Sequence, residues 1–174
     1  MNGQHPPASD GGTGTSRSNS NDFLLMTGQP GLLGLSDGSI STLAPLFAAA
    51  LSTGSSHVAL LVGLSAAIGA AISMAVSEAL SDDGELTGRG APWRRGMITG
   101  AGTLLGGSMH SLPFLIPHFR VALTVASVVV AFELVAIAWV RWRFFPSVSV
   151  GRSLVQVTVA GALVFAVGLI LGSA

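Results

Sequence analysis

The sequence contains no cysteine, no tyrosine and no lysine among its 174 residues. The absence of cysteine excludes disulfide bonds and metal sites that use thiolate ligands. Charged side chains make up only 9% of the chain, whereas a typical soluble domain carries about 25%. Hydrophobic residues account for 49% of the chain. Because so few charged groups cannot cover a surface in water, the composition predicts an integral membrane protein.

The first 22 residues differ from the rest, since they are rich in Gly, Ser, Asn and Pro and show no apolar periodicity. Such a segment cannot bury enough apolar surface to become ordered. It also lacks the charged start and apolar core of a signal peptide. We therefore expect residues 1–22 to form a disordered tail and residues 23–174 to form one membrane domain.

Long apolar stretches organise this domain. Crossing the hydrocarbon core of a bilayer takes about 20 mostly apolar residues. Five stretches meet this requirement, at about residues 33–53, 57–80, 96–117, 120–141 and 153–173. The sequence therefore predicts an all-α membrane protein with five transmembrane helices.

The positions of the arginines predict the orientation of these helices. Seven of the eight arginines lie in the tail or beside the second and fourth connectors, and Arg120 alone lies beside the third. Cytoplasmic loops of membrane proteins carry an excess of basic residues. The tryptophans, Trp93, Trp139 and Trp142, lie close to the arginine-rich connectors, where indoles favour the membrane interface. Both signals predict a cytoplasmic N-terminus and an outside C-terminus.

Asp37 is the first candidate functional residue. Ionisable side chains within a membrane span are costly, so each one is a candidate for function. Pro45 follows eight residues later and should kink the helix or open its hydrogen bonding, and Gly38 adds flexibility. The alternative is that Asp37 caps a helix that starts after it.

Met74 and Glu78 are four residues apart, so they share one face of the second stretch. Because the first two helices run in opposite directions, we expect Asp37 to lie at a similar depth, where the three side chains can form a cation site. A thioether suits softer first-row metals and adds nothing for magnesium. The alternatives are that Met74 fills apolar space and that Glu78 is a helix-end carboxylate, which reaches interfacial water or pairs with Arg94 or Arg95.

His110 and Glu133 are two further polar residues within apolar stretches. They can form separate steps of a secondary proton or metal path. Equally, they can form a structural hydrogen bond between helices. The sequence leaves both interpretations open.

An acidic connector follows the second stretch and contains Asp82, Asp83 and Glu85. It lacks the alternating acids and the final glutamate of an EF-hand, which excludes a calcium loop of that type. These acids can attract cations to a cytoplasmic mouth, or they can form a solvated turn that pairs with nearby arginines.

Two motifs resemble a known family. The segments "GLSDGSISTLAPLFAAAL" and "GLSAAIGAAISMAVSEALS" are similar to the first two spans of the vacuolar iron transporter family. That family carries Asp-Gly early in span one and Ser-Met followed by Glu late in span two, which fall here on Asp37, Gly38, Ser73, Met74 and Glu78. The segments "EALSDDGELTGRGAPWRRG" and "HSLPFLIPHF" are more similar to a bacterial branch, in which this domain follows a ferritin-like (rubrerythrin-type) domain and exports iron. The resemblance covers about residues 31–174.

The resemblance implies a homodimer in a bacterial inner (cytoplasmic) membrane, with the two first spans facing each other across a metal path. It implies export of ferrous iron or manganese from the cytoplasm by proton antiport, with Asp37, Met74 and Glu78 as translocation residues. Partners are then the lipid bilayer, divalent metal ions and protons, with no nucleic acid and no prosthetic group. The short connectors and tail contain neither the Glu-rich domain of eukaryotic members nor a ferritin-like domain.

Other functions fit the residues less well. A proton-coupled exporter of small organic cations is the main alternative, but such sites favour aromatic rings, and only Phe132 adjoins a candidate carboxylate. An enzyme is not expected, because Ser108 and His110 are two residues apart and point to different helix faces. A di-iron oxidase would need several intramembrane histidines, and only His110 lies well inside a span. A non-transporting assembly factor would leave the buried acids unexplained.

Overall fold

The computed structural model of the protein describes residues 23–81, 83–85, 87–144 and 150–173. Within these residues, helices are the only regular secondary structure, which confirms the predicted all-α fold. The helices are α2 (Gln29–Ser41), α3 (Leu43–Thr53), α4 (Ser56–Ala79), α5 (Pro92–Met109), α6 (Phe119–Phe144) and α7 (Val150–Ser173). A π-helical turn at Leu24–Gly28 precedes α2, and a 3-10 turn at Leu112–Leu115 follows α5. The predicted tail, residues 1–22, lies outside the described residues.

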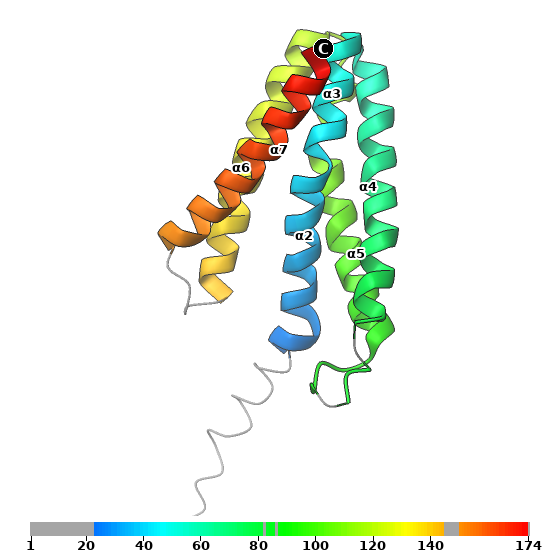
Figure 1. The fold of residues 1–174 in the computed structure, drawn as a ribbon, viewed down its shortest axis with the longest axis vertical. Coiled ribbons are helices and arrows are strands. Elements are labelled where there is room, and N and C mark those ends of the chain that lie inside the picture. The colour runs from blue at the N-terminus through cyan, green and yellow to red at the C-terminus, as the bar shows by residue number, and fades with distance from the viewer. Residues whose placement is uncertain (1–22, 82, 86, 145–149, 174) are drawn as a thin grey trace, which may run out of the picture.

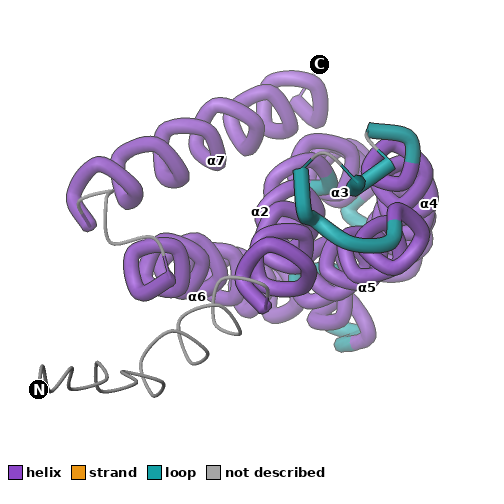
Figure 2. The backbone as a smooth tube through the Cα atoms, turned by 90° about the horizontal axis from the view of Figure 1, so that it is seen from below, coloured by secondary structure: helices purple, strands orange, loops and turns teal. Residues whose placement is uncertain are grey.

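The helices form an antiparallel bundle (Figure 1). α2 and α3 follow one another along a single rod, and α4, α5, α6 and α7 then alternate in direction. α5 packs between α2 and α4, while α7 packs on α3 and α6. Viewed along the bundle, α6 and α7 lie on one side of α2, and α4 and α5 lie on the other (Figure 2).

Six arginines gather at one end of this bundle. They occur where α4 leads into α5 and where α6 leads into α7, at positions Arg89, Arg94, Arg95, Arg141, Arg143 and Arg152. We call this end the arginine-rich end. Arg120, at the start of α6, lies at the opposite end. The exposed indoles of Trp93, Trp139 and Trp142 also lie near the arginine-rich end.

Four helical segments are long and apolar enough to cross a membrane. They are Leu24–Thr53, Ser56–Ala79, Phe119–Arg143 and Val155–Ser173. Their outward surfaces expose large apolar side chains, among them Leu61, Ile72, Phe132, Leu163 and Ile170. Burying such surfaces requires a lipid environment or a partner. The length and composition of these segments indicate an integral membrane protein.

The third predicted stretch, 96–117, differs from the structure. Its helix, α5, starts at Pro92 and already ends at Met109, and it is not among the four segments that are apolar enough to span. Pro113 has no N–H to continue the hydrogen-bond ladder, and the chain forms a 3-10 turn around it instead. His110 therefore follows a helix end rather than lying within a helix.

The first predicted stretch also needs a correction. α2 already begins at Gln29, so Asp37 lies inside the helix and does not cap it. The rod is interrupted at Thr42, between Ser41 and Leu43. Pro45 lacks the N–H that the Ser41 carbonyl would accept in a regular helix, which explains the interruption.

Glycines bring α2, α4 and α5 into close contact. A Cβ atom at Gly34 or Gly38 would overlap the backbone of Thr99 or Thr103 on α5. Gly38 is thus used for contact between helices, in addition to any flexibility that it gives α2. Close approach through small residues is a common way for helices to associate in membranes.

Replacing Gly34 with alanine should therefore lower the stability of the protein. The added methyl group would overlap the Thr99 backbone and push α2 away from α5, and overpacking of this kind costs about 1–3 kcal/mol. Gly69→Ala is the matched control, because nothing lies within 4 Å of a Cβ at that position on α4. Thermal unfolding in detergent should show a lower Tm for the first variant only, and equal Tm values would contradict this packing.

Candidate functional site

Asp37 lies on α2, in a shallow pocket that opens between α2 and α7. Leu33, Ser36, Ile40 and Ser41 of α2 line this pocket, together with Val164 of α7. The side chain is partly exposed, and among the described residues it has no hydrogen-bond or ion-pair partner. The adjacent Gly38 faces α5, whereas Asp37 lines the pocket on the side of α2 that faces α7. Its carboxylate is therefore open to a ligand.

Glu78 is in a different environment at the end of α4. It is 7% exposed, and its Oε1 atom accepts hydrogen bonds from Arg95 Nε at 3.0 Å and from Arg89 Nη2 at 2.8 Å. Arg95 is completely buried and also donates from Nη1 to the Gly90 carbonyl at 2.8 Å. Two guanidinium groups thus neutralise the Glu78 carboxylate, as the arginine-pairing alternative predicts for Arg95.

The structure does not bring the three predicted translocation residues together within one chain. Gly38, next to Asp37, contacts α5 at Thr103, whereas Glu78 contacts α5 at Arg95. These two positions on α5 are about 12 Å apart along the helix axis. Met74 is partly buried one turn from Glu78, and α5 lies between α4 and α2. Among the described residues, no three His, Cys, Asp or Glu side chains are grouped to hold a metal ion.

The acidic connector forms an exposed turn at the arginine-rich end. The Glu85 N–H donates to Asp83 Oδ1 at 3.0 Å, and both side chains face solvent. Asp82 lies outside the described residues. Asp83 and Glu85 thus lie at the same end of the bundle as Glu78, in the position expected for either a mouth or a solvated turn.

A second polar cluster is completely enclosed in the bundle. His110 is 0% exposed, and its Nε2 atom lies 2.7 Å from Thr42 Oγ1. Its Nδ1 atom lies 2.9 Å from Glu133 Oε2, on α6. The sequence left open whether His110 and Glu133 form a structural hydrogen bond or steps of a proton or metal path. The structure shows the hydrogen bond directly. The other carboxylate oxygen, Glu133 Oε1, is buried and has no hydrogen-bond partner in the described structure.

Small residues allow this cluster to form at the helix interruption. Gly107 packs so closely that a Cβ there would lie 3.0 Å from Thr42 Cγ2 and 2.8 Å from Ala67 Cβ. α5 then ends at Met109, and the next residue, His110, turns between Thr42 and α6. Sequence reasoning missed Thr42, and its only signal is its place three residues before Pro45.

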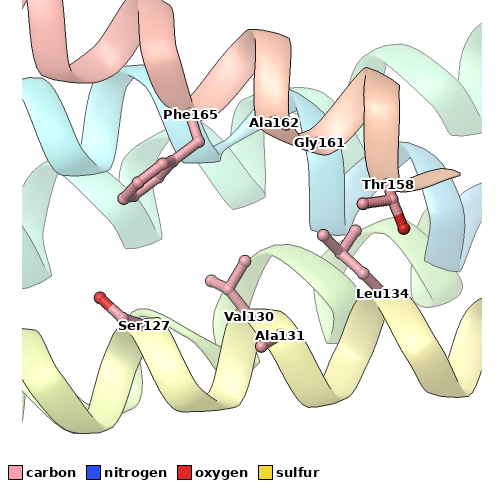
Figure 3. A pocket seen from close by; sticks show the side chains of 8 residues that line it. All are labelled: Ser127, Val130, Ala131, Leu134, Thr158, Gly161, Ala162 and Phe165. Atoms are coloured by element: carbon pink, nitrogen blue, oxygen red, sulfur yellow. The ribbon is translucent and has the colours of Figure 1, made fainter.

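An open pocket lies between α6 and α7. Its walls are largely apolar, with the side chains of Val130, Leu134 and Phe165 directed into the space (Figure 3). The hydroxyl groups of Ser127 and Thr158 are the polar side-chain groups in its lining, and Ser127 Oγ donates to the Leu123 carbonyl. Since no charged side chain lines this pocket, it is not suited to a cation.

Comparisons with protein-family models, with curated proteins and with solved structures found no significant match to this chain. The two polar clusters and the open carboxylate of Asp37 are therefore the observations on which a function can be proposed.

Proposed function

We propose that this protein is a divalent transition-metal transporter that moves ferrous iron or manganese out of the cytoplasm in exchange for protons. The observation that carries this proposal is the open carboxylate of Asp37, inside the 30-residue apolar segment Leu24–Thr53. A carboxylate at this depth is costly unless a cation or a proton neutralises it. Competition between a metal ion and a proton for the same oxygens would couple their fluxes.

The surroundings of Asp37 favour a metal ion over an organic cation. The pocket contributes the hydroxyl groups of Ser36 and Ser41 beside the carboxylate, and no aromatic ring lines it. Pro45 also leaves the Ser41 carbonyl without its usual helical donor. Oxygen ligands of these types suit manganese and similar ions, whereas organic cations favour aromatic surfaces.

The proposal includes five membrane crossings and a homodimer. We assign the crossings to α2 with α3, to α4, to α5, to α6 and to α7, with the arginine-rich end in the cytoplasm of a bacterial cell. α2 alone offers fewer oxygen ligands than a divalent ion takes. A second copy that faces α2 would supply the remaining ligands, as the family resemblance implies.

Met74 and Glu78 are assigned to an earlier step, on the cytoplasmic side of Asp37. The two side chains lie one turn apart on α4, near the arginine-rich end of the bundle. In the described conformation Arg89 and Arg95 donate hydrogen bonds to Glu78 Oε1. A metal ion that binds Glu78 Oε1 would therefore have to displace these hydrogen bonds.

Purified protein in proteoliposomes tests the proposed function. We expect manganese or ferrous iron to cross the membrane, at a rate that increases when a proton gradient is imposed in the opposite direction. Empty liposomes and liposomes that receive a lipophilic organic cation instead of a metal serve as controls. Absence of metal transport, or metal transport that ignores the proton gradient, would contradict the proposal. Transport of the organic cation alone would favour the alternative function.

A further inference from the structure

We infer that Thr42, His110 and Glu133 form a binding site for one exchangeable proton, and that the occupancy of this site controls a hydrogen bond at the helix interruption next to Asp37. The three side chains are 1%, 0% and 5% exposed, and they join the α2–α3 junction, the end of α5 and the middle of α6. The use of this proton in metal exchange rests on the proposed function, whereas the proton site itself does not.

The hydrogen atoms at Thr42 can be counted. Its Oγ1 atom lies 2.8 Å from the Gly38 carbonyl oxygen and 2.7 Å from His110 Nε2. A carbonyl oxygen only accepts, and a hydroxyl group has a single hydrogen. The hydroxyl therefore donates to Gly38, and the contact with the ring requires a hydrogen atom on Nε2.

The contact on the other side of the ring then requires one more proton. His110 Nδ1 lies 2.9 Å from Glu133 Oε2. With Nε2 already protonated, the hydrogen atom of this bond sits either on Nδ1, giving an imidazolium and a carboxylate, or on Oε2, giving two neutral groups. Without it, two lone pairs would face each other inside the bundle, which is unfavourable. The observed arrangement is therefore the proton-loaded state.

Loss of the proton changes the hydrogen bonds in a defined way. The hydrogen atom on Nε2 leaves, and the ring keeps the hydrogen atom of the Nδ1–Oε2 bond on Nδ1, facing the Glu133 carboxylate. Nε2 then becomes an acceptor, and the Thr42 hydroxyl group turns from the Gly38 carbonyl to the ring.

This switch acts on the part of α2 that carries Asp37. Gly38 directly follows Asp37, and its carbonyl loses the Thr42 hydroxyl group when the site is empty. The helix is already interrupted at Thr42, so this hydrogen bond joins the hydroxyl group to α2 at a turn where regular helical bonding stops. Proton occupancy can therefore bias the conformation around the Asp37 carboxylate.

No other titratable side chain in the described structure makes a hydrogen bond or ion pair with this cluster. Asp37 of α2 lines the pocket toward α7 instead. The charged and histidine side chains of the remaining packed elements lie toward helix ends, at His57, Glu78, Arg94, Arg95, Arg120, Arg141, Arg143 and Arg152. The proton balance of the site is thus set by His110 and Glu133.

Nitrogen NMR of histidine-labelled, metal-free protein in lipid bilayers tests this inference. The chain has four histidines, so the His110 signals are assigned by their absence from a His110→Gln sample. At low pH we expect both ring nitrogens to be protonated or to share a proton with Glu133. At high pH we expect a neutral ring with hydrogen on Nδ1 and none on Nε2. A ring that keeps hydrogen on Nε2 throughout, or signals that do not change with pH, would overturn the inference.

Two substitutions at Thr42 provide a matched comparison in the same experiment. Thr42→Ser keeps the hydroxyl group and should leave the titration midpoint of His110 unchanged. Thr42→Val removes two hydrogen bonds from the loaded state, from Nε2 to Oγ1 and from Oγ1 to the Gly38 carbonyl, but only one from the empty state. The proton affinity should therefore fall about tenfold, as expected for a net loss of one hydrogen bond to a buried group. Equal midpoints for the two variants would overturn the proposed role of Thr42. All of these results are independent of whether the protein transports metal.

Discussion

Replacing Glu78 with glutamine is expected to lower the free energy of unfolding by about 3–5 kcal/mol, because removing the charge of one partner from a buried ion pair is strongly destabilising. The guanidinium group of Arg95 is completely buried and would lose the carboxylate that accepts from its Nε at 3.0 Å, while its Nη1 would still donate to the neutral Gly90 carbonyl at 2.8 Å. Chemical unfolding of the variant in detergent, followed by circular dichroism, measures this loss.

Two further variants separate the ion pair from its surroundings. Arg95→Gln should be about as destabilising as Glu78→Gln, and the double variant should be more stable than the sum of the single losses predicts. The exposed Glu85→Gln is the matched control and should change stability by less than about 0.5 kcal/mol. Unchanged stability of Glu78→Gln together with lost metal transport would contradict a structural ion pair and would make ion binding the main role of Glu78.

Replacing Asp37 with asparagine is expected to abolish metal transport while leaving the fold intact. Asp37 has no partner among the described residues, so its charge is not needed for packing. Transport should fall by more than about 100-fold, because even outer-shell partners of metal ligands change affinity by about 10–100-fold. The rate of manganese uptake by proteoliposomes measures this effect, and Tm measures the integrity of the fold.

Asp83→Asn is the matched control for this substitution, since it removes the same charge from an exposed turn. It should retain most of the wild-type rate. Wild-type transport by Asp37→Asn would show that the ion does not depend on this carboxylate. A strong loss in Asp83→Asn instead would move the site to the acidic connector.

The apolar stretches predicted the helices well because hydrophobic length is a local property. α4, α6 and α7 lie over the stretches 57–80, 120–141 and 153–173. The third stretch, 96–117, was too long because apolar residues continue past the point where Pro113 ends regular hydrogen bonding. The hydrophobicity of a segment does not predict where backbone hydrogen bonding stops and the helix ends.

The site was harder to predict because it depends on how neighbouring helices are aligned. Counting residues from the expected ends of each span placed Asp37 and Glu78 at the same depth in the membrane. The actual positions of α2, α5 and α4 relative to one another follow from the close contacts at their glycines. α5 lies between the helices that carry the two carboxylates, and Arg95 of α5 donates a hydrogen bond to Glu78. The sequence did single out His110 and Glu133, since polar residues in apolar stretches are conspicuous. Thr42 is a residue type that also occurs at many helix positions without special function.

The most direct test of the metal site at Asp37 is X-ray diffraction from crystals soaked in manganese, with data collected near the manganese absorption edge. We predict an anomalous difference peak beside the Asp37 carboxylate of the wild-type protein, and no peak there in crystals of Asp37→Asn. No peak near Asp37 at saturating manganese, or a peak at Glu78 without one at Asp37, would contradict this account.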